Sequence, residues 1–379
     1  MTTTSPNVGQ TFETVGVGTS ASRKSLGRLI IIAGTLLFAA VLLFQVLYAA
    51  GVSASGFASW RPVFYAYFLW AASVVLGQIL IRGEQGQRAA FVLPAVFFTV
   101  ALVIFPTAFG LYLAFTDWNL SGSVGRRFNG FDNIVALWND PFYWNALRNM
   151  VYYGLAVFFE YAIAFGLAVL LNADIKAQRF FRIVFLLPFM LSPVAVSWMV
   201  GKSIMENRFG PAARLARLLG WDNPAFFTDP WIARLSIEVM DAWVFIPLIM
   251  ILLLAGLQAL PKDLLEAARV DGASPWQTFW RITFPLMLPV SITAILIRII
   301  FKLKLADIVI NVTSGGPGGA TDTVSSFIYR EYRDRSNVGY GTALAEFYLI
   351  AIVIFITIAL LVTTRWVSRY STARAVDRV

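Results

Sequence analysis

The sequence contains no cysteine and no histidine among its 379 residues. The missing residue types exclude several kinds of site: disulfide frameworks, the usual zinc ligand sets, cysteine nucleophiles and Ser-His-Asp triads. The chain also lacks a Gly-x4-Gly-Lys-Ser/Thr loop, so it does not hydrolyse ATP by the P-loop route. These absences predict a protein without a catalytic site, a metal site or a cofactor of its own, and they argue against a membrane-embedded glycosyltransferase or protease.

Charged residues are scarce as well. They make up 13% of the chain, against about 25% in soluble domains, while 58% of the residues are hydrophobic. The net charge is +9, but the basic residues are dispersed between apolar runs and form no Lys/Arg-rich stretch of the kind that binds nucleic acid. The composition therefore predicts an integral membrane protein whose surroundings are membrane lipid, with no nucleic-acid partner.

Eight apolar segments reach the length of about 20 residues that a helix needs to cross about 30 Å of hydrocarbon. The predicted fold is an all-α polytopic membrane protein with eight transmembrane helices. The first apolar run is longer than a signal-peptide core, and we expect it to be retained. Residues 1–28 are rich in Ser, Thr and Gly and predict a disordered tail. The spans are expected near residues 29–50, 62–81, 89–115, 150–171, 183–203, 237–257, 286–308 and 343–364.

The orientation follows from the short connections between spans, because short basic loops tend to stay in the cytoplasm. Basic residues predominate on the side that holds the N-terminus, so both termini are expected to be cytoplasmic. The outer connections would be residues 116–149, 206–236 and 309–342, and they are rich in Trp, Asn, Asp, Gly and Pro. These loops are either a docking surface or a source of interfacial aromatic residues.

The stretch between the sixth and seventh spans reads EAARVDGASPWQTFWRITFPLMLP from Glu266 to Pro289. Its pattern predicts a short helix from about Pro261, a break at Gly272, and a second helix begun by a Ser274/Gln277 capping box. Three aromatic residues then share one face of the second helix, namely Trp276, Phe279 and Trp280. The stretch therefore predicts a helix-turn-helix outside the bilayer, and an ordinary amphipathic interfacial helix is the alternative.

The spacing of Glu266-Ala267-Ala268, Gly272, Ile282 and Pro285 resembles the EAA loop of binding-protein-dependent ABC importer permeases. Downstream, Thr313 to Pro317 resembles the Thr-x-Gly-Gly-Pro outer turn of sugar-type permeases. The likeness covers residues 90–365 and is to the maltose-type carbohydrate permease family. It implies a six-helix permease core at 89–365 with a cytoplasmic coupling helix, two accessory transmembrane helices at 29–88, and cytoplasmic tails at 1–28 and 366–379.

The resemblance also implies a function and partners. The chain would be the multi-pass subunit of an ATP-driven importer in a bacterial cytoplasmic membrane, moving a carbohydrate or polyol that an extracytoplasmic binding protein delivers. Two ATP-binding subunits would bind ATP with Mg and hydrolyse it, and a second, homologous permease subunit would complete the pathway. The residues that would contact the ATPase are Glu266, Ala267, Ala268, Gly272 and Pro285.

Charges inside spans are costly and usually face a cavity or one another. By the resemblance, Lys302 and Leu305 fall where maltose-type permeases contact sugar, and Asp241, Phe245 and Leu248 are further candidates for the substrate pathway. A lysine at this position differs from the amide and aromatic side chains that usually contact sugars. Either the solute is an anionic sugar derivative, or Lys302 neutralises Asp241 or the Glu160 carboxylate, or its ammonium group snorkels to the membrane surface.

Two further expectations concern charges in the spans. Lys304 and Asp307 are predicted to pair with each other. The alternative function is an ion-coupled secondary transporter, in which Glu160, Asp241 and Asp307 would bind the coupling cation.

Overall fold

The computed structural model describes residues 20–49, 52–122 and 125–376, with side chains as far as residue 365. The chain divides into two compact units, Met1–Phe109 and Gly110–Val379. Among the described residues the regular structure is helical, apart from two isolated β-bridges that join Thr116 to Phe128 and Asn119 to Asn337. The all-α prediction is confirmed.

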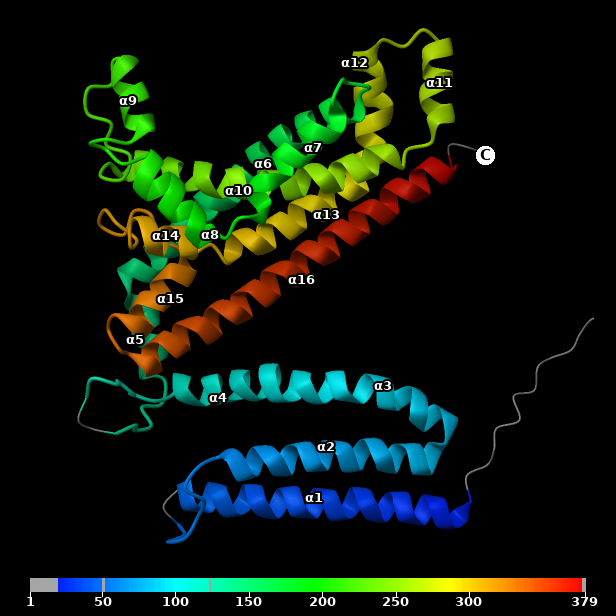
Figure 1. Ribbon diagram of the computed structural model, residues 1–379, viewed down its shortest axis with the longest axis vertical. Helices are drawn as coiled ribbons and strands as arrows, with labels where there is room; N and C mark the ends of the chain where they lie inside the picture. Colours follow the sequence, from blue (N-terminus) through cyan, green and yellow to red (C-terminus); the bar gives the residue numbers. More distant parts are fainter. Residues whose placement is uncertain (1–19, 50–51, 123–124, 377–379) are drawn as a thin grey trace, which may run out of the picture. The chain divides into compact units, whose positions relative to one another are not determined.

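The first unit is built from antiparallel helices (Figure 1). They are α1 (Ala21–Ala49), α2 (Arg61–Arg82) and a long helix made of α3 (Glu84–Thr99), the π-helical segment η1 (Val100–Ile104) and α4 (Phe105–Ala114), whose end belongs to the second unit. Glycines let α1 and α2 approach closely, since a Cβ on Gly77 would lie 2.3 Å from the Ile31 side chain. The Tyr67 hydroxyl then ties α2 to α3 by donating to the Phe97 carbonyl at 2.6 Å.

Both chain ends are more helical than expected. Helix α1 begins at Ala21, so residues 21–28 are not part of a disordered tail. The reason is local: the Ser20 hydroxyl accepts a hydrogen bond from the Arg23 amide at 3.4 Å, which caps a helix that the apolar span then continues. At the other end α16 (Val338–Val376) runs past the expected span into the predicted tail. Residues 1–19 and 377–379 of the expected tails lie outside the described residues.

The second unit is centred on three helices, α6 (Pro141–Asn172), α10 (Pro230–Gln258) and α13 (Phe284–Leu303), which pack on one another. Their shared core contains Ala164, Leu253 and Met287, all fully buried. Aspartates cap α6 and α10, each followed by a proline in the first turn. The other elements are α5 (Asp132–Asn139), α7 (Gln178–Leu186), η2 (Leu187–Met190), α8 (Pro193–Val196), η3 (Ser197–Ile204), α9 (Pro211–Leu218), α11 (Lys262–Val270), α12 (Pro275–Thr278), η4 (Phe279–Thr283), α14 (Asp307–Val312) and α15 (Val324–Arg333).

The expected eight spans are confirmed, with one difference. Seven helices in the described part of the chain are long and apolar enough to cross a membrane, and there are 8 spans if one bent pair is counted. That pair, Gln178–Met190 and Pro193–Ile204, is bent by 94° where a single straight fifth span was predicted. The bend follows from Pro193, because the residue before a proline is driven out of the helical region and Ser192 has an extended backbone.

Candidate functional site

The segment between α10 and α13 forms the predicted helix-turn-helix. Figure 1 shows α11 and α12 projecting beyond the ends of α10 and α13. The turn has Gly272 in the left-handed region at φ 75°, where other residues are strained. Ser274 then caps α12: its hydroxyl accepts from the Gln277 amide at 3.3 Å, and the Gln277 side chain accepts from the Ser274 amide at 2.9 Å. Pro261 precedes α11 as its N-cap.

The residues expected to contact an ATPase lie on both arms of this segment. Glu266 and Ala267 are exposed on α11, whereas Ala268 is buried against the rest of the unit. Gly272 is exposed, and a Cβ built on it would meet no atom of this chain within 4 Å. Pro285 is half-buried in the first turn of α13, so it belongs to the base of the projecting hairpin.

Aromatic residues fix the second arm to the transmembrane helices. The ring centroids of Trp276 and Trp280 are 5.5 Å apart, and those of Phe279 and Trp280 are 5.1 Å apart. Phe279 also packs edge-on against Phe165 of α6, at 5.5 Å between centroids. Trp276 remains 70% exposed. The hairpin thus has a base packed on α6 and an open face that includes Trp276.

The charges inside the spans meet in one buried cluster. Arg298 and Lys302 lie four residues apart on α13, so they share a helix face. The Arg298 guanidinium donates two hydrogen bonds to Glu160 of α6, one of them at 2.9 Å, and a third to Asp241 of α10. Lys302 Nζ donates to Glu160 at 2.9 Å and also to Asp241. The side chains of these four residues are at most 3% exposed.

Sequence reasoning missed one member of this cluster. Lys302 Nζ lies 2.9 and 2.8 Å from the two carboxylate oxygens of Glu238, which also belongs to α10. The Glu238 side chain is 15% exposed, more than any other member. A signal was present in the sequence, because Glu238 and Asp241 are three residues apart and must lie on the same face of a helix. The carboxylate oxygens of Glu160, Glu238 and Asp241 lie within 4.8 Å of one another, but Lys302 and Arg298 already occupy them.

The cluster decides between the two alternatives for Lys302. This lysine is bound by three carboxylates, so it offers no free positive charge to an anionic solute. Among the described residues, no ion pair joins Lys304 to Asp307, and both are exposed. The predicted pairing of those two is wrong, because the helix stops at Leu303 and restarts at Asp307.

The apolar candidates for the substrate pathway lie around the cluster in different ways. The Phe245 ring lies under the Arg298 guanidinium, 4.5 Å from ring centroid to Cζ. Leu305 is buried, and its carbonyl accepts a hydrogen bond from the Thr323 hydroxyl. Leu248 is half-buried one turn further along α10. The structure therefore brings Lys302, Asp241 and Phe245 together around Arg298, and it places Leu305 against the segment that follows α14.

That following segment, residues 313–323, is folded into the protein and is not a free outer loop. The Asn149 amide of α6 donates to the carbonyls of Gly319 at 3.0 Å and Asp322 at 2.9 Å. Arg234 of α10 donates to the Ala320 carbonyl at 2.7 Å. Burial raises the pKa of Asp322, and the ion pair with Arg330 opposes that shift. None of these partners was predicted, since each lies far away in the sequence.

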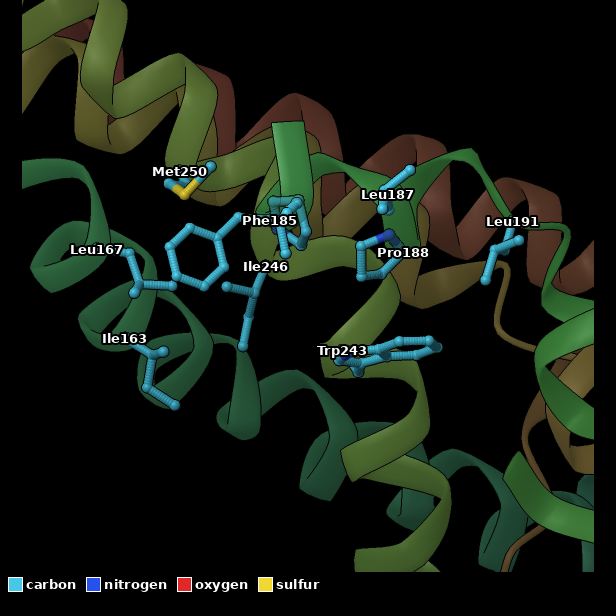
Figure 2. A pocket seen from close by; sticks show the side chains of 11 residues that line it. Ile163, Leu167, Phe185, Leu187, Pro188, Leu191, Trp243, Ile246 and Met250 are labelled. Carbon is cyan, nitrogen blue, oxygen red and sulfur yellow. The ribbon is translucent and has the colours of Figure 1, made fainter. Parts of the chain in front are cut away.

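An apolar cavity of about 600 Å³ lies between α6, the bent α7/η2 segment and α10. Figure 2 shows Trp243 and Ile246 of α10 beside it, with Leu167 on α6 and Phe185 on α7. The lining residues carry no charge and no hydroxyl or amide side chain to orient a polar solute. They are Ile163, Leu167, Val184, Phe185, Leu187, Pro188, Leu191, Trp243, Ile246, Pro247 and Met250.

The fold defines a polytopic, helical membrane protein with a helix-turn-helix that projects beyond its transmembrane helices. Residues 142–375 match the family model described as the binding-protein-dependent transport system inner membrane component. The chain belongs to this family: it is a multi-pass inner-membrane permease subunit and is not itself catalytic.

Several known proteins are similar to it. The sulfoquinovosyl glycerol transport system permease protein SmoG of Agrobacterium fabrum is 31% identical over 69% of this chain and 86% of that protein. The trehalose/maltose transport system permease protein MalF of Thermococcus litoralis is 31% identical over 61% of this chain and 78% of its own. The crystal structure of a bacterial alginate ABC transporter, in complex with an alginate pentasaccharide-bound periplasmic protein, contains a chain with TM-score 0.62 at 23% identity. That alignment covers 72% of this chain and 92% of the other, and it shows the same fold.

Proposed function

We propose that this chain is the transmembrane subunit of an ATP-driven importer for a carbohydrate or polyol. An extracytoplasmic binding protein delivers the solute, two partner subunits hydrolyse ATP with Mg, and a second, homologous permease subunit lines the rest of the pathway. The observation that carries the proposal is the α11–α12 hairpin, with Glu266 exposed on an arm that projects beyond the transmembrane helices. The relatives support the solute class, since SmoG and MalF are named for sugar derivatives and sugars.

The hairpin suits an ATPase cleft for physical reasons. The small side chains of Ala267 and Ala268 keep α11 narrow enough to enter a groove, and the Glu266 carboxylate can pair with a basic side chain of the partner. Gly272 provides the turn that returns the chain to the membrane. In this arrangement the exposed Glu266, Ala267 and Gly272 contact the ATPase, whereas Ala268, expected to do so too, is buried and packs α11 on its own chain. Pro285 lies in the first turn of the helix that receives the movement.

Transport follows by alternating access. ATP-driven closure of the partner subunits draws the hairpins together and opens the outer side of the pathway, and hydrolysis reverses the change. The hairpin lies on the cytoplasmic side, which puts both termini in the cytoplasm. Residues 89–365 form the permease core in this proposal, and the helices at 29–88 are accessory. Phe245 and Leu248, which are half-buried, are this chain's candidates for the lining of the pathway, and the buried Lys302, Asp241 and Leu305 support that lining from behind.

The ion-coupled alternative gains no support from the site. Glu160 and Asp241, which would bind the coupling cation, are held by Arg298 and Lys302. Asp307, the remaining candidate, is exposed at the start of α14 and apart from them.

Charge reversal at Glu266 tests the proposal. Glu266→Lys is expected to abolish ATP-driven uptake of maltodextrin or another binding-protein ligand in proteoliposomes and to reduce co-purification of the ATPase subunits. The thermal stability should stay unchanged, because exposed substitutions usually alter stability by less than about 0.5 kcal/mol. Asp174→Lys, at an exposed position outside the hairpin, is the matched control and should keep both properties. Full uptake and full co-purification in Glu266→Lys would refute the coupling role.

A further inference from the structure

The apolar cavity of Figure 2 lies on the side of α10 that faces away from the ion cluster. Met250, which lines the cavity, is nine residues along the helix from Asp241. Nine residues are about two and a half helical turns, so the two side chains are on opposite faces of α10. The candidates for the solute pathway on α10, Asp241 and Phe245, therefore do not share a face with the cavity.

The walls of the cavity suit neither water nor a sugar. A buried water needs two to four polar partners, yet among the described lining residues the only hydrogen-bond donor of a side chain is the Trp243 indole N–H. The helices around the cavity all belong to candidate membrane spans, so the surrounding hydrocarbon supplies an occupant that matches the walls, an acyl chain. The volume of about 600 Å³ is within the range of about 300–1,000 Å³ of small-molecule sites.

A basic side chain lies one helical turn from this cavity. Arg182 is three residues before Phe185, which lines the cavity, so the two share a face of α7. Figure 1 shows that α7 begins toward the end of the bundle where the hairpin projects. The Nε atom of Arg182 is buried, but it has no hydrogen-bond partner among the described residues. A buried donor without an acceptor is costly, and a phosphate oxygen would satisfy it.

We propose that this protein has a phospholipid site separate from the solute pathway: an acyl chain fills the apolar cavity, and the headgroup phosphate accepts a hydrogen bond from Arg182. Residues 173–186 contain three basic residues, Arg182 among them, and a single acidic one. This excess of positive charge favours an anionic headgroup, as in other basic pockets between transmembrane helices. The proposal goes beyond the importer function, because it concerns a lipid and not the transported solute.

Photoactivatable lipids test the proposal on the assembled complex, with the ATPase subunits and the second permease, in proteoliposomes of phosphatidylethanolamine. A trace of phosphatidylglycerol carries a diazirine in its acyl chain, and a parallel sample contains phosphatidylethanolamine with the same label. Peptide mass spectrometry then compares the label on residues 184–191 and 243–250 with the label on Leu36 and Leu43, which are exposed on α1. The measurement needs no ATP, so a failure of transport does not affect it.

Relative to α1, the cavity residues should react more with the phosphatidylglycerol probe than with the phosphatidylethanolamine probe. Arg182→Gln should lower this preference by at least about fivefold, because hydrogen bonds to charged groups are the stronger ones. Arg182→Lys, which keeps the charge, should retain most of the preference. Arg88→Gln removes an exposed positive charge near the start of α3 and lines no part of the cavity, so it is the matched control and should change nothing.

Ile163→Trp tests the part of the site that holds the acyl chain. Ile163 lines the cavity but is 54% exposed, so the larger side chain should occupy part of the cavity without unfolding α6. The label from both probes should fall in the cavity and stay unchanged on α1. Leu155→Trp, at a position of α6 that is 56% exposed and outside the cavity, is the matched control and should leave both labels unchanged.

The unaltered chain decides the question if a variant fails to assemble. Added unlabelled phosphatidylglycerol should then reduce the cavity label more steeply than the α1 label. Three results overturn the inference. They are a preference that Arg182→Gln leaves unchanged, unlabelled phosphatidylglycerol that lowers both labels equally, and cavity residues that take up no label in the assembled complex, which would mean that a partner subunit covers them.

Discussion

Removal of the Arg298 guanidinium takes a fully buried cation away from two carboxylates. Arg298→Met keeps an unbranched stem of similar length but deletes the donors to Glu160 and Asp241. The cluster would then hold three carboxylates and only Lys302 to neutralise them. Because the Arg298 side chain is fully buried, water does not replace the lost partner.

The expected loss of stability follows from that burial. Removing one partner of a buried ion pair costs about 3–5 kcal/mol, since the remaining charge is left uncompensated. For a domain of 150–250 residues, 1 kcal/mol shifts the melting temperature by about 2–4 °C. The apparent melting temperature of the assembled complex should therefore fall by about 6–20 °C.

The measurement is the thermal unfolding of the detergent-solubilised complex, followed by tryptophan fluorescence. Arg179→Met is the matched control, because Arg179 is exposed on α7 and should lose almost nothing. Adding Glu160→Gln to Arg298→Met removes one of the stranded carboxylates and should recover part of the stability. The reasoning is refuted if Arg298→Met shifts the melting temperature no more than Arg179→Met, or if the second change only adds a further loss.

Two further substitutions test the other parts of the site. Gly272→Val forces a branched residue into the left-handed region and should reduce co-purification of the ATPase. Gly220→Val imposes the same strain at φ 93° in another loop and should leave co-purification unchanged. Equal losses of co-purification in the two variants would contradict the assignment of Gly272 to the ATPase contact. Asn149→Ala leaves the Asp322 carbonyl without its side-chain donor, while the Gly319 carbonyl keeps the Asn145 amide at 2.6 Å. The change should make the 313–323 segment more sensitive to protease by at least about tenfold, equivalent to about 1.4 kcal/mol of local stability, whereas Asn139→Ala at an exposed position should not.

The helix-turn-helix was predictable from the sequence because its determinants are local. A capping box, a glycine with a left-handed backbone and an aromatic face at helical spacing each involve residues within one or two turns. The structure shows the Ser274/Gln277 box and the Gly272 turn where they were expected. The spans were predictable for the same reason, since hydropathy and helix length are properties of a continuous segment.

The ion cluster and the 313–323 segment were less predictable because their partners come from distant parts of the chain. Asn149 reaches Asp322 across 173 positions, and Arg298 reaches Glu160 across 138. Sequence spacing tells which charges share a helix face, but it does not tell which faces meet. The expected pairing of Lys304 with Asp307 illustrates the limit, since a helix break between them removed the spacing on which that expectation depended.

The connectivity of the chain gives the cluster a mechanical consequence. Helix α10 leads into the hairpin and α13 leads out of it, and the cluster joins the same two helices through Glu238 and Asp241 on one side and Arg298 and Lys302 on the other. Glu160 adds α6 to this joint. Helices α10 and α13 therefore cannot separate at the level of the cluster without breaking buried ion pairs, which is costly. We expect a force on the hairpin to move α6, α10 and α13 as one rigid body. A displacement of the hairpin would then produce an equal displacement of these helices at the cluster.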